Sequence, residues 1–196
     1  VGERDEHGRI REVVYRVNEI FWSLQGEGFW TGTPMVFVRL SGCNLSCPFC
    51  DTDHSAFREM QADEIVAEAL KYPCNRVCLT GGEPSLQVDD TLVEALHAAG
   101  FGIHIETNGT RALPEDIDWV PLSPKSRIVL EKADELKLVL SEGANPAAWE
   151  SFPAAWHFLQ PCDNGGSTNV EETIDYIKRH PAWRLSLQTH KLLGIR

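Results

Sequence analysis

The segment MVFVRLSGCNLSCPFCDT, residues 35–52, decides the fold. Its first part, residues 35–40, is a short apolar run of the kind that forms a buried strand. The loop that follows carries Cys43, Cys47 and Cys50 in a C-x3-C-x2-C array. In parallel βα folds the reactive residues collect beyond the carboxyl ends of the strands. The segment therefore predicts a parallel sheet with its chemistry at that edge.

The three clustered cysteines indicate an iron–sulfur site. Thiolates are soft ligands that suit either zinc or an iron–sulfur cluster. Structural zinc normally takes four protein ligands, whereas three thiolates on a 4Fe–4S cube leave one iron open. A zinc module or plain buried cysteines stay open as alternatives. Because Cys74, Cys78 and Cys162 lack such spacing, core or incidental roles are expected for them.

The pattern on both sides of this segment predicts an open barrel. Apolar runs alternate with amphipathic helical patterns, which is typical of βα units around a mainly parallel sheet. A complete eightfold barrel usually needs about 250 residues, and this chain has 196. We expect an α/β fold, an incomplete TIM-like βα barrel in one domain, residues 1–196. The expected strands are 35–40, 77–80, 102–107, 136–140, 156–160 and 185–188, and the expected helices lie near 63–71, 92–99 and 170–179.

Composition restricts where the protein works. The formal net charge of −11 disfavours binding to a nucleic-acid backbone, which requires clustered Lys and Arg. No run approaches the roughly 18 apolar residues that a membrane span requires. The charged stretch at residues 1–17 has no apolar segment of the secretory type. We expect a cytoplasmic protein with reduced thiols, no nucleic-acid partner and no membrane.

Three further strings lie at the expected ends of strands. The stretch TGGEP, residues 80–84, carries a glycine pair that lets backbone groups approach a ligand. A tight turn without any ligand is the alternative. The strings SPK, residues 123–125, and QPCD, residues 160–163, can reach the same edge. Taken alone, their polar side chains are as readily solvated or structural.

Together these motifs resemble the radical S-adenosylmethionine (SAM) superfamily. The cysteine spacing, an aromatic Phe49 just before the last cysteine, and the GGEP string carry the resemblance. It implies a 4Fe–4S cluster on Cys43, Cys47 and Cys50, with SAM on the open iron. It also implies cofactor contacts from Phe49, Gly82, Glu83, Ser123, Pro124, Lys125, Gln160, Pro161, Cys162 and Asp163.

Within the superfamily, six patches resemble the 7-carboxy-7-deazaguanine synthase family. They are residues 21–52, TGGEP, ETNGT, SPK, QP and the terminal LSLQTHKLLGI, and the similarity extends from about residue 17 to 195. The resemblance implies ring contraction of 6-carboxy-5,6,7,8-tetrahydropterin to 7-carboxy-7-deazaguanine with loss of ammonia. It further implies Mg2+, an electron donor such as flavodoxin, and a homodimer. Because the cofactor radical performs the chemistry, no protein side chain is expected to be catalytic.

A carboxylated pterin needs a fixed cation and several directional polar groups. The resemblance assigns the carboxylate to Arg39, although a structural salt bridge is a serious alternative for this residue. Thr52 matches the family's Mg2+ ligand; the alternative is that Thr52 starts a helix. The implied substrate contacts are Leu24, Gln25, Gly26, Glu27, Arg39, Thr80, Glu106 and His190.

Two other functions use the same cysteine triplet. An activating enzyme that installs a glycyl radical on a partner protein is the first, but it gives the LQGEG, QTHK and SPK strings no role. A non-enzymatic iron–sulfur electron carrier is the second. Reductive cleavage of SAM by the purified protein distinguishes the carrier from either enzyme.

Overall fold

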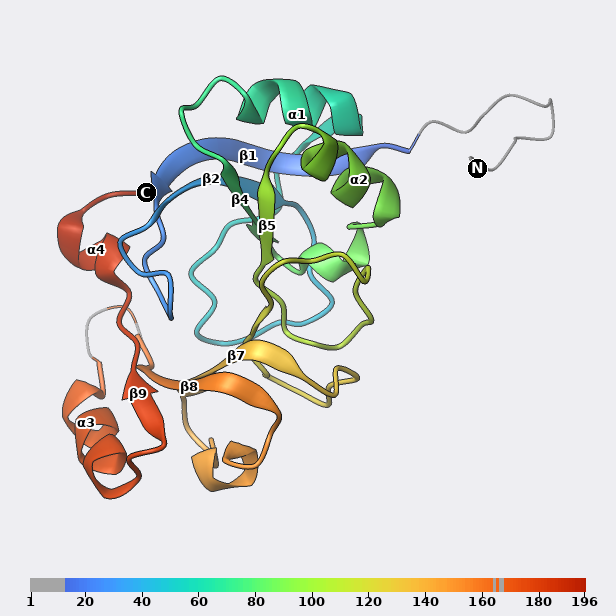
Figure 1. Ribbon diagram of the computed structural model, residues 1–196. Coiled ribbons are helices and arrows are strands. Elements are labelled where there is room, and N and C mark those ends of the chain that lie inside the picture. The colour runs from blue at the N-terminus through green and yellow to red at the C-terminus, as the bar shows by residue number, and fades with distance from the viewer. Residues whose placement is uncertain (1–12, 164, 166–167) are drawn as a thin grey trace.

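The computed structural model describes residues 13–163, 165 and 168–196 (Figure 1). The charged residues 1–12, on which the expectation about a secretory segment partly rests, lie outside that part. In the described residues no helix is both long and apolar enough to cross a membrane.

The first sheet combines antiparallel and parallel strands in the order β3-β1-β2-β4-β5. Strand β1 (Tyr15–Leu24) pairs antiparallel with both β2 (Pro34–Leu40) and the short β3 (Arg58–Met60). Strands β4 (Arg76–Gly81) and β5 (Gly102–Ile105) then continue in parallel from β2. The predicted strands at 35–40 and 77–80 are confirmed. Strands β1 and β3 were not foreseen.

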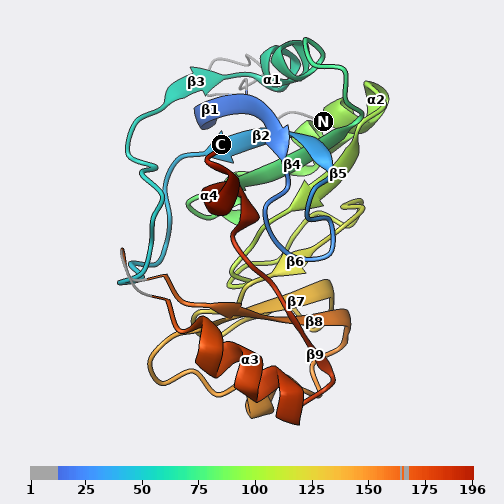
Figure 2. The ribbon, with the colours of Figure 1, turned by 90° about the vertical axis from the view of Figure 1, so that its left-hand side faces the viewer.

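The second sheet is entirely parallel, in the order β6-β7-β8-β9. Its strands are β6 (Pro121–Leu122), β7 (Ala133–Leu140), β8 (Ala154–Pro161) and β9 (Trp183–Leu185). Parallel bridges from His104 to Trp119 and from Thr107 to Leu122 connect β5 with this sheet. In the described part of the chain no pairing joins β9 back to the first sheet. The prediction of an incomplete, mainly parallel barrel is confirmed (Figures 1 and 2).

Helices cover the outer faces of the sheets. Helices α1 (Ala62–Ala69) and α2 (Asp90–Ala98) pack over the first sheet, where Ile65, Leu92 and Leu96 are fully buried in one apolar core. Helix α3 (Val170–Arg179) packs against β8 and β9. Two single-turn 3-10 segments, η1 (Pro84–Leu86) and η2 (Pro146–Trp149), follow β4 and β7. The three predicted helices are confirmed, and their apolar stripes explain why each lies on a sheet.

Two predicted strands are wrong in extent. The strand expected at 102–107 ends at Ile105, and beyond it Thr107 makes an isolated bridge to Leu122. The strand expected at 185–188 ends at Leu185, and helix α4 (Thr189–Leu193) begins four residues later. The reason is tertiary: the backbone nitrogen and the hydroxyl of Thr189 both donate to the carbonyl of Gly26, at 3.0 and 2.9 Å. This contact draws the chain away from the sheet and across its open edge. Figure 1 shows α4 at the left of the molecule, between the C-terminus above it and β9 below it.

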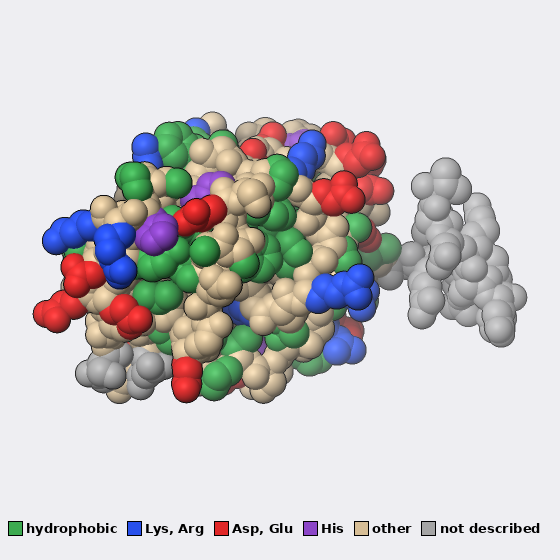
Figure 3. Space-filling view, turned by 90° about the horizontal axis from the view of Figure 1, so that it is seen from below, with side chains coloured by type: hydrophobic (Ala, Val, Ile, Leu, Met, Phe, Trp, Pro, Cys, Tyr) green, Lys and Arg blue, Asp and Glu red, His purple; other side chains and the backbone are tan. Residues whose placement is uncertain are grey.

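Lys and Arg side chains form no large basic patch on the face shown in Figure 3. They lie mostly near the rim, among Asp and Glu side chains. On this face the absence of a basic patch accords with the acidic balance of the sequence.

Candidate functional site

A cavity of about 290 Å3 lies at the carboxyl ends of the parallel strands, inside the open barrel. The loops after β2, β4 and β5 form one wall, and the inward side chains of β7 and β8 form another. Residues from the β1–β2 loop and from α4 close the rest. The cavity therefore lies at the edge where parallel folds carry out their chemistry.

The cysteine loop brings Cys43, Cys47 and Cys50 to one end of this cavity. The backbone nitrogen of Cys50 donates to the carbonyl of Cys47 at 3.1 Å, which makes a tight turn between these two residues. Burial raises the pKa of Cys47, and its neighbours Cys43 and Cys50 raise it further, against the opposing effect of Lys125. In the described residues no three His, Cys, Asp or Glu side chains are gathered around the position of a single metal ion. The shared cavity wall, by contrast, gives three thiols access to one larger group.

The glycine turn after β4 rests directly on the cysteine loop. Gly81 has a φ of 135°, a conformation that favours glycine. A Cβ atom at Gly82 would overlap the carbonyl of Gly42, one residue before the first cysteine. The nitrogen of Glu83 donates to that same carbonyl at 2.9 Å. Only glycine permits this close approach of the two loops, so the motif has a structural role besides any contact with a cofactor.

Glu83 is buried and anchors the next loop. Its carboxylate accepts hydrogen bonds from the Thr107 hydroxyl and the Asn108 nitrogen, both at 2.7 Å, and from the Ser85 nitrogen at 3.1 Å. Asn108 in turn donates to Asn44 of the cysteine loop at 3.1 Å. The loops after β2, β4 and β5 thus form one hydrogen-bonded unit.

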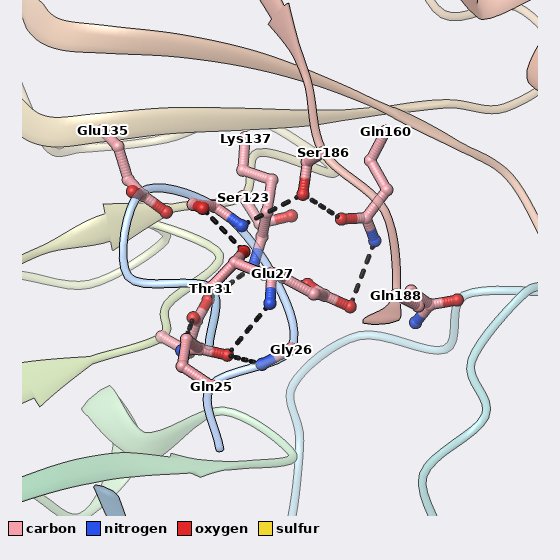
Figure 4. A network of polar contacts seen from close by, with 12 residues as sticks. Gln25, Gly26, Glu27, Thr31, Ser123, Glu135, Lys137, Gln160, Ser186 and Gln188 are labelled. Atoms are coloured by element: carbon pink, nitrogen blue, oxygen red, sulfur yellow. Dashed lines mark hydrogen bonds and ion pairs between the residues drawn. The ribbon is translucent and has the colours of Figure 1, made fainter. Parts of the chain in front are cut away.

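A buried ion-pair network forms the opposite wall (Figure 4). Lys137 Nζ on β7 lies 2.6 Å from Glu27 Oε2 and 2.9 Å from Glu106 Oε2. Gln25 Nε2 donates to Glu106 Oε1 at 3.0 Å, and Gln160 Nε2 donates to Glu27 Oε1 at 3.2 Å. All five side chains line the cavity.

The environment of each buried carboxylate sets its pKa. Burial by itself raises the pKa of Glu27, but the ion pair with Lys137 outweighs it and lowers the pKa to about 2. Glu135 lies two residues before Lys137 on β7. Its carboxylate accepts a hydrogen bond from the backbone nitrogen of Phe29 at 2.8 Å. Burial raises the pKa of Glu135 to about 7, with Lys137 opposing and Glu106 adding to the shift. Two buried carboxylates near one ammonium group therefore differ strongly in acidity.

Arg39 on β2 lines the cavity. Its Nε lies 2.9 Å from Glu19 Oε1 on the paired strand β1, and its guanidinium group stacks over Phe21. The structural salt bridge that the sequence left open is thus present. Because Glu19 takes the Nε edge, the terminal guanidinium nitrogens can still bind a carboxylate in the cavity.

Helix α4 connects the cysteine loop with the loop after β8. Lys191 Nζ lies 2.5 Å from Asp51 and 2.9 Å from Asp163. His190 packs against Gly26, where an added Cβ would overlap its ring. Thr52, next to Asp51, faces the cavity in an extended segment, so the alternative that Thr52 starts a helix is wrong.

The cavity assembles nearly every residue that the sequence nominated. Pro124 lies instead on a neighbouring groove, and the backbone of Cys162 donates to Asn169 outside the cavity wall. Lys125 is exposed as a residue, yet its Nζ bonds to Ser123 inside the site, and burial of that group and the charge of Lys137 lower its pKa. The nominated residues that line the cavity are Leu24, Gln25, Gly26, Glu27, Arg39, Cys43, Cys47, Phe49, Cys50, Thr52, Thr80, Gly82, Glu83, Glu106, Ser123, Lys125, Gln160, Pro161, Asp163 and His190.

Sequence reasoning missed Lys137, Ser186 and Lys191. Lys137 lies within the apolar strand ADELKLVL, two residues from Glu135, so both side chains point to the same face. That spacing of opposite charges in a buried strand was the available signal. Ser186, whose hydroxyl donates to Gln160 at 2.9 Å, carried no comparable signal.

Comparison with known proteins places the chain among enzymes of one kind. Residues 37–126 match the Radical SAM superfamily model. The 7-carboxy-7-deazaguanine synthase of Bacteroides thetaiotaomicron is 57% identical over 94% of this chain and 100% of its own length. The corresponding synthase of Bradyrhizobium diazoefficiens is 46% identical over 93% of this chain and 99% of its own. The crystal structure of QueE from Escherichia coli superimposes with a TM-score of 0.76 at 28% identity, covering 89% of this chain and 94% of that one.

Proposed function

This chain belongs to the 7-carboxy-7-deazaguanine synthase family of radical SAM enzymes, and we propose that it contracts the ring of 6-carboxy-5,6,7,8-tetrahydropterin to 7-carboxy-7-deazaguanine. The reaction releases ammonia, so the protein is a carbon–nitrogen lyase, and its product feeds queuosine-type 7-deazapurine synthesis. The observation that carries the proposal is the single cavity that joins three thiols, the glycine turn, Arg39 and the Glu27–Lys137–Glu106 network.

As a radical SAM enzyme, the protein uses a 4Fe–4S cluster and SAM. Cys43, Cys47 and Cys50 would hold the cluster. When bound together, the cluster and SAM supply a 5'-deoxyadenosyl radical. We assign SAM binding to the Gly82 backbone and to polar groups of Ser123, Lys125, Gln160 and Asp163, which face the same cavity.

The cavity wall is suited to both ends of a carboxylated pterin. Arg39 offers two planar donors to the carboxylate. The carboxylates of Glu27 and Glu106 are acceptors for the N–H groups of the pterin ring. These side chains bind and orient the substrate, and Gly26 with His190 above it excludes water from that end.

We propose a Mg2+ site next to Thr52. Magnesium prefers hard oxygen ligands and often keeps most of them from substrate and water. Thr52 Oγ1 lies 3.4 Å from Asp51 Oδ1, so two oxygens are available at one position on the cavity wall. The ion would connect this position to the substrate carboxylate.

The enzyme requires a reductant, and we propose a flavodoxin as the donor and the cytoplasm as the compartment. We also propose a homodimer and one domain over residues 1–196.

Exposed apolar side chains support the homodimer: Leu192 and Leu193 on α4 are 74% and 65% exposed, and Leu24 is 37% exposed. Sedimentation of the purified chain measures its oligomeric state.

An anaerobic assay tests the proposed function. The reconstituted protein is incubated with 6-carboxytetrahydropterin, SAM, Mg2+ and a reductant, and the products are identified by mass spectrometry. We expect 7-carboxy-7-deazaguanine, with omission of Mg2+ lowering the yield. Accumulation of 5'-deoxyadenosine and methionine without that product would refute the substrate while leaving the radical chemistry in place.

A further inference from the structure

Lys137 is a charged side chain with almost no access to solvent. It lies in the middle of strand β7 with its side chain 4% exposed, pointing into the barrel (Figure 4). A buried ammonium group is costly unless it is paired. Lys137 is paired twice, with carboxylates from the β1–β2 loop and from the end of β5. These two segments and β7 are far apart in the sequence, so the ammonium group joins three elements at one point.

In each of the two carboxylates that pair with Lys137, one oxygen contacts the ammonium group and the other accepts a hydrogen bond from a glutamine. Glu27 has Lys137 on Oε2 and Gln160 on Oε1. Glu106 has Lys137 on Oε2 and Gln25 on Oε1. A carboxylate oxygen can accept more than one hydrogen bond, so both groups keep acceptor capacity toward the cavity that they line.

We infer that Lys137 is a positioning residue that holds the carboxylates of Glu27 and Glu106 aimed at the N–H edge of the substrate ring. The inference rests on the proposed function, because that edge belongs to a pterin, whose amino group and adjacent ring N–H present two neighbouring donors. The two carboxylates and the ammonium group of this cluster together carry a formal charge of −1. The wall therefore attracts the donor edge and repels the carboxylate of the substrate, which Arg39 receives instead.

Lys137 is the cation that pairs directly with both carboxylates. In the described part of the chain it is the sole Lys or Arg within ion-pair distance of Glu27 or Glu106. The other titratable groups that face this cluster are Glu135 on the same strand, Lys125 on the β6–β7 loop, Cys78 on β4 and His190 on α4. If Lys137 loses its charge, two neighbouring carboxylates must share the site. Such pairs retain a proton at higher pH than an isolated carboxyl group.

The test compares Lys137→Met with Lys137→Arg in the reconstituted holoenzyme. The probe is 6-carboxypterin, an oxidised analogue that keeps the carboxylate and the amino edge, and its dissociation constant is measured from about pH 5.5 to 7.5. For the wild type and for Lys137→Arg we expect the same pH profile, because a cation pairs with both carboxylates in each of them. For Lys137→Met we expect affinity at least about 10-fold weaker at the acid end, recovering as the shared proton dissociates. Iron content and SAM affinity should match the wild type.

A charge-balanced variant separates positioning from simple structural support. Lys137→Met combined with Glu27→Gln and Glu106→Gln leaves no carboxyl group in the cluster to take up a proton, so the additional pH dependence of Lys137→Met should disappear even though binding stays weak. A Lys137→Met enzyme with the affinity and the pH profile of the wild type would overturn the inference. If that variant does not fold, a Lys137→Arg enzyme whose pH profile differs from that of the wild type would overturn it equally. Failure of the wild type to bind the probe would overturn the proposed function together with it.

Discussion

The two sheets contribute to the same cavity in different ways. The five-stranded sheet supplies loops whose backbone geometry does the positioning, such as the cysteine loop and the Gly82 turn that rests on it. The four-stranded sheet supplies single polar side chains, such as Lys137 and Gln160, that point inward from regular strands. A functional loop is recognisable in the sequence as a short motif of several residues, whereas a polar side chain that points inward from a strand is a single residue without such a motif. Substitutions in the loops of the first sheet and substitutions of the inward side chains of the second sheet should therefore affect different properties of the enzyme.

The largest effect is expected at the cysteine loop. Cys47→Ala removes one of three thiols and should abolish both cluster binding and turnover, because three thiolates are the whole protein contribution to such a cluster. Iron and sulfide content and product formation measure this result. Cys74→Ala is the matched control: its thiol contacts the carbonyl of Pro34, away from the cavity, so it should keep full iron content. An active, cluster-free Cys47→Ala would contradict the assignment.

Two carboxyl groups near Lys137, those of Glu27 and Glu135, should make the stability of the protein respond to pH in opposite directions. Glu27 has a pKa of about 2 against a usual 4.5, so the unfolded chain binds more protons and stability falls as pH drops through that window. Glu135 has a pKa of about 7 against 4.5, so the folded chain binds more protons and stability falls as pH rises from about 4.5 to 7. Each shift corresponds to roughly 3 kcal/mol at most.

Denaturant unfolding of two variants measures this difference. Glu135→Gln should raise the free energy of unfolding near pH 8 by up to roughly 3 kcal/mol, and the gain should vanish near pH 4. Glu27→Gln should lower the free energy of unfolding at neutral pH. It should also make that free energy depend less on pH in the acid range. The same pH profile for both variants would show that their environments do not differ as described.

A smaller effect is expected at the glycine turn. Gly82→Ala forces a methyl group against the Gly42 carbonyl and should shift the cysteine loop, at a cost of about 1–3 kcal/mol in stability or SAM affinity. Gly102→Ala on β5 is the control, because the nearest atoms to its added Cβ lie 3.9 Å away. Calorimetric titration with SAM measures both variants. Equal affinities for SAM would mean that the close approach of the two loops does not position the cofactor.

The smallest effect is expected where α4 connects the loops from the two sheets. Lys191 is 34% exposed, and ion pairs in contact with water contribute about 1 kcal/mol or less. Lys191→Met should therefore raise KM for the pterin only a few-fold, with little change in kcat. Added salt screens the ion pairs of Lys191, so it should raise the KM of the wild type toward that of the variant. A loss of iron in Lys191→Met would instead indicate that the bridge to Asp51 supports the cysteine loop itself.

The sequence predicted most of the parallel strands because each has its own apolar run, but it missed β6, which has two residues. It missed β1 because Glu19 and Asn18 interrupt the apolar alternation, and pairing with β2 overrides that local pattern. It placed β9 too far along the chain, since the end of that strand depends on the contact of Thr189 with Gly26. The single domain and the individual site roles stay predictions.

By itself the sequence determined the cysteine array, the glycine turn and the family, because these depend on residue types at fixed short spacings. The tertiary structure alone decided that Lys137 joins Glu27 to Glu106, that Glu19 holds Arg39, and that Lys191 connects Asp51 with Asp163. The physical reason is the separation along the chain of the residues that interact. A motif acts through bonds along the chain, whereas the ionisation of a buried group depends on whichever charges the fold brings within a few ångströms.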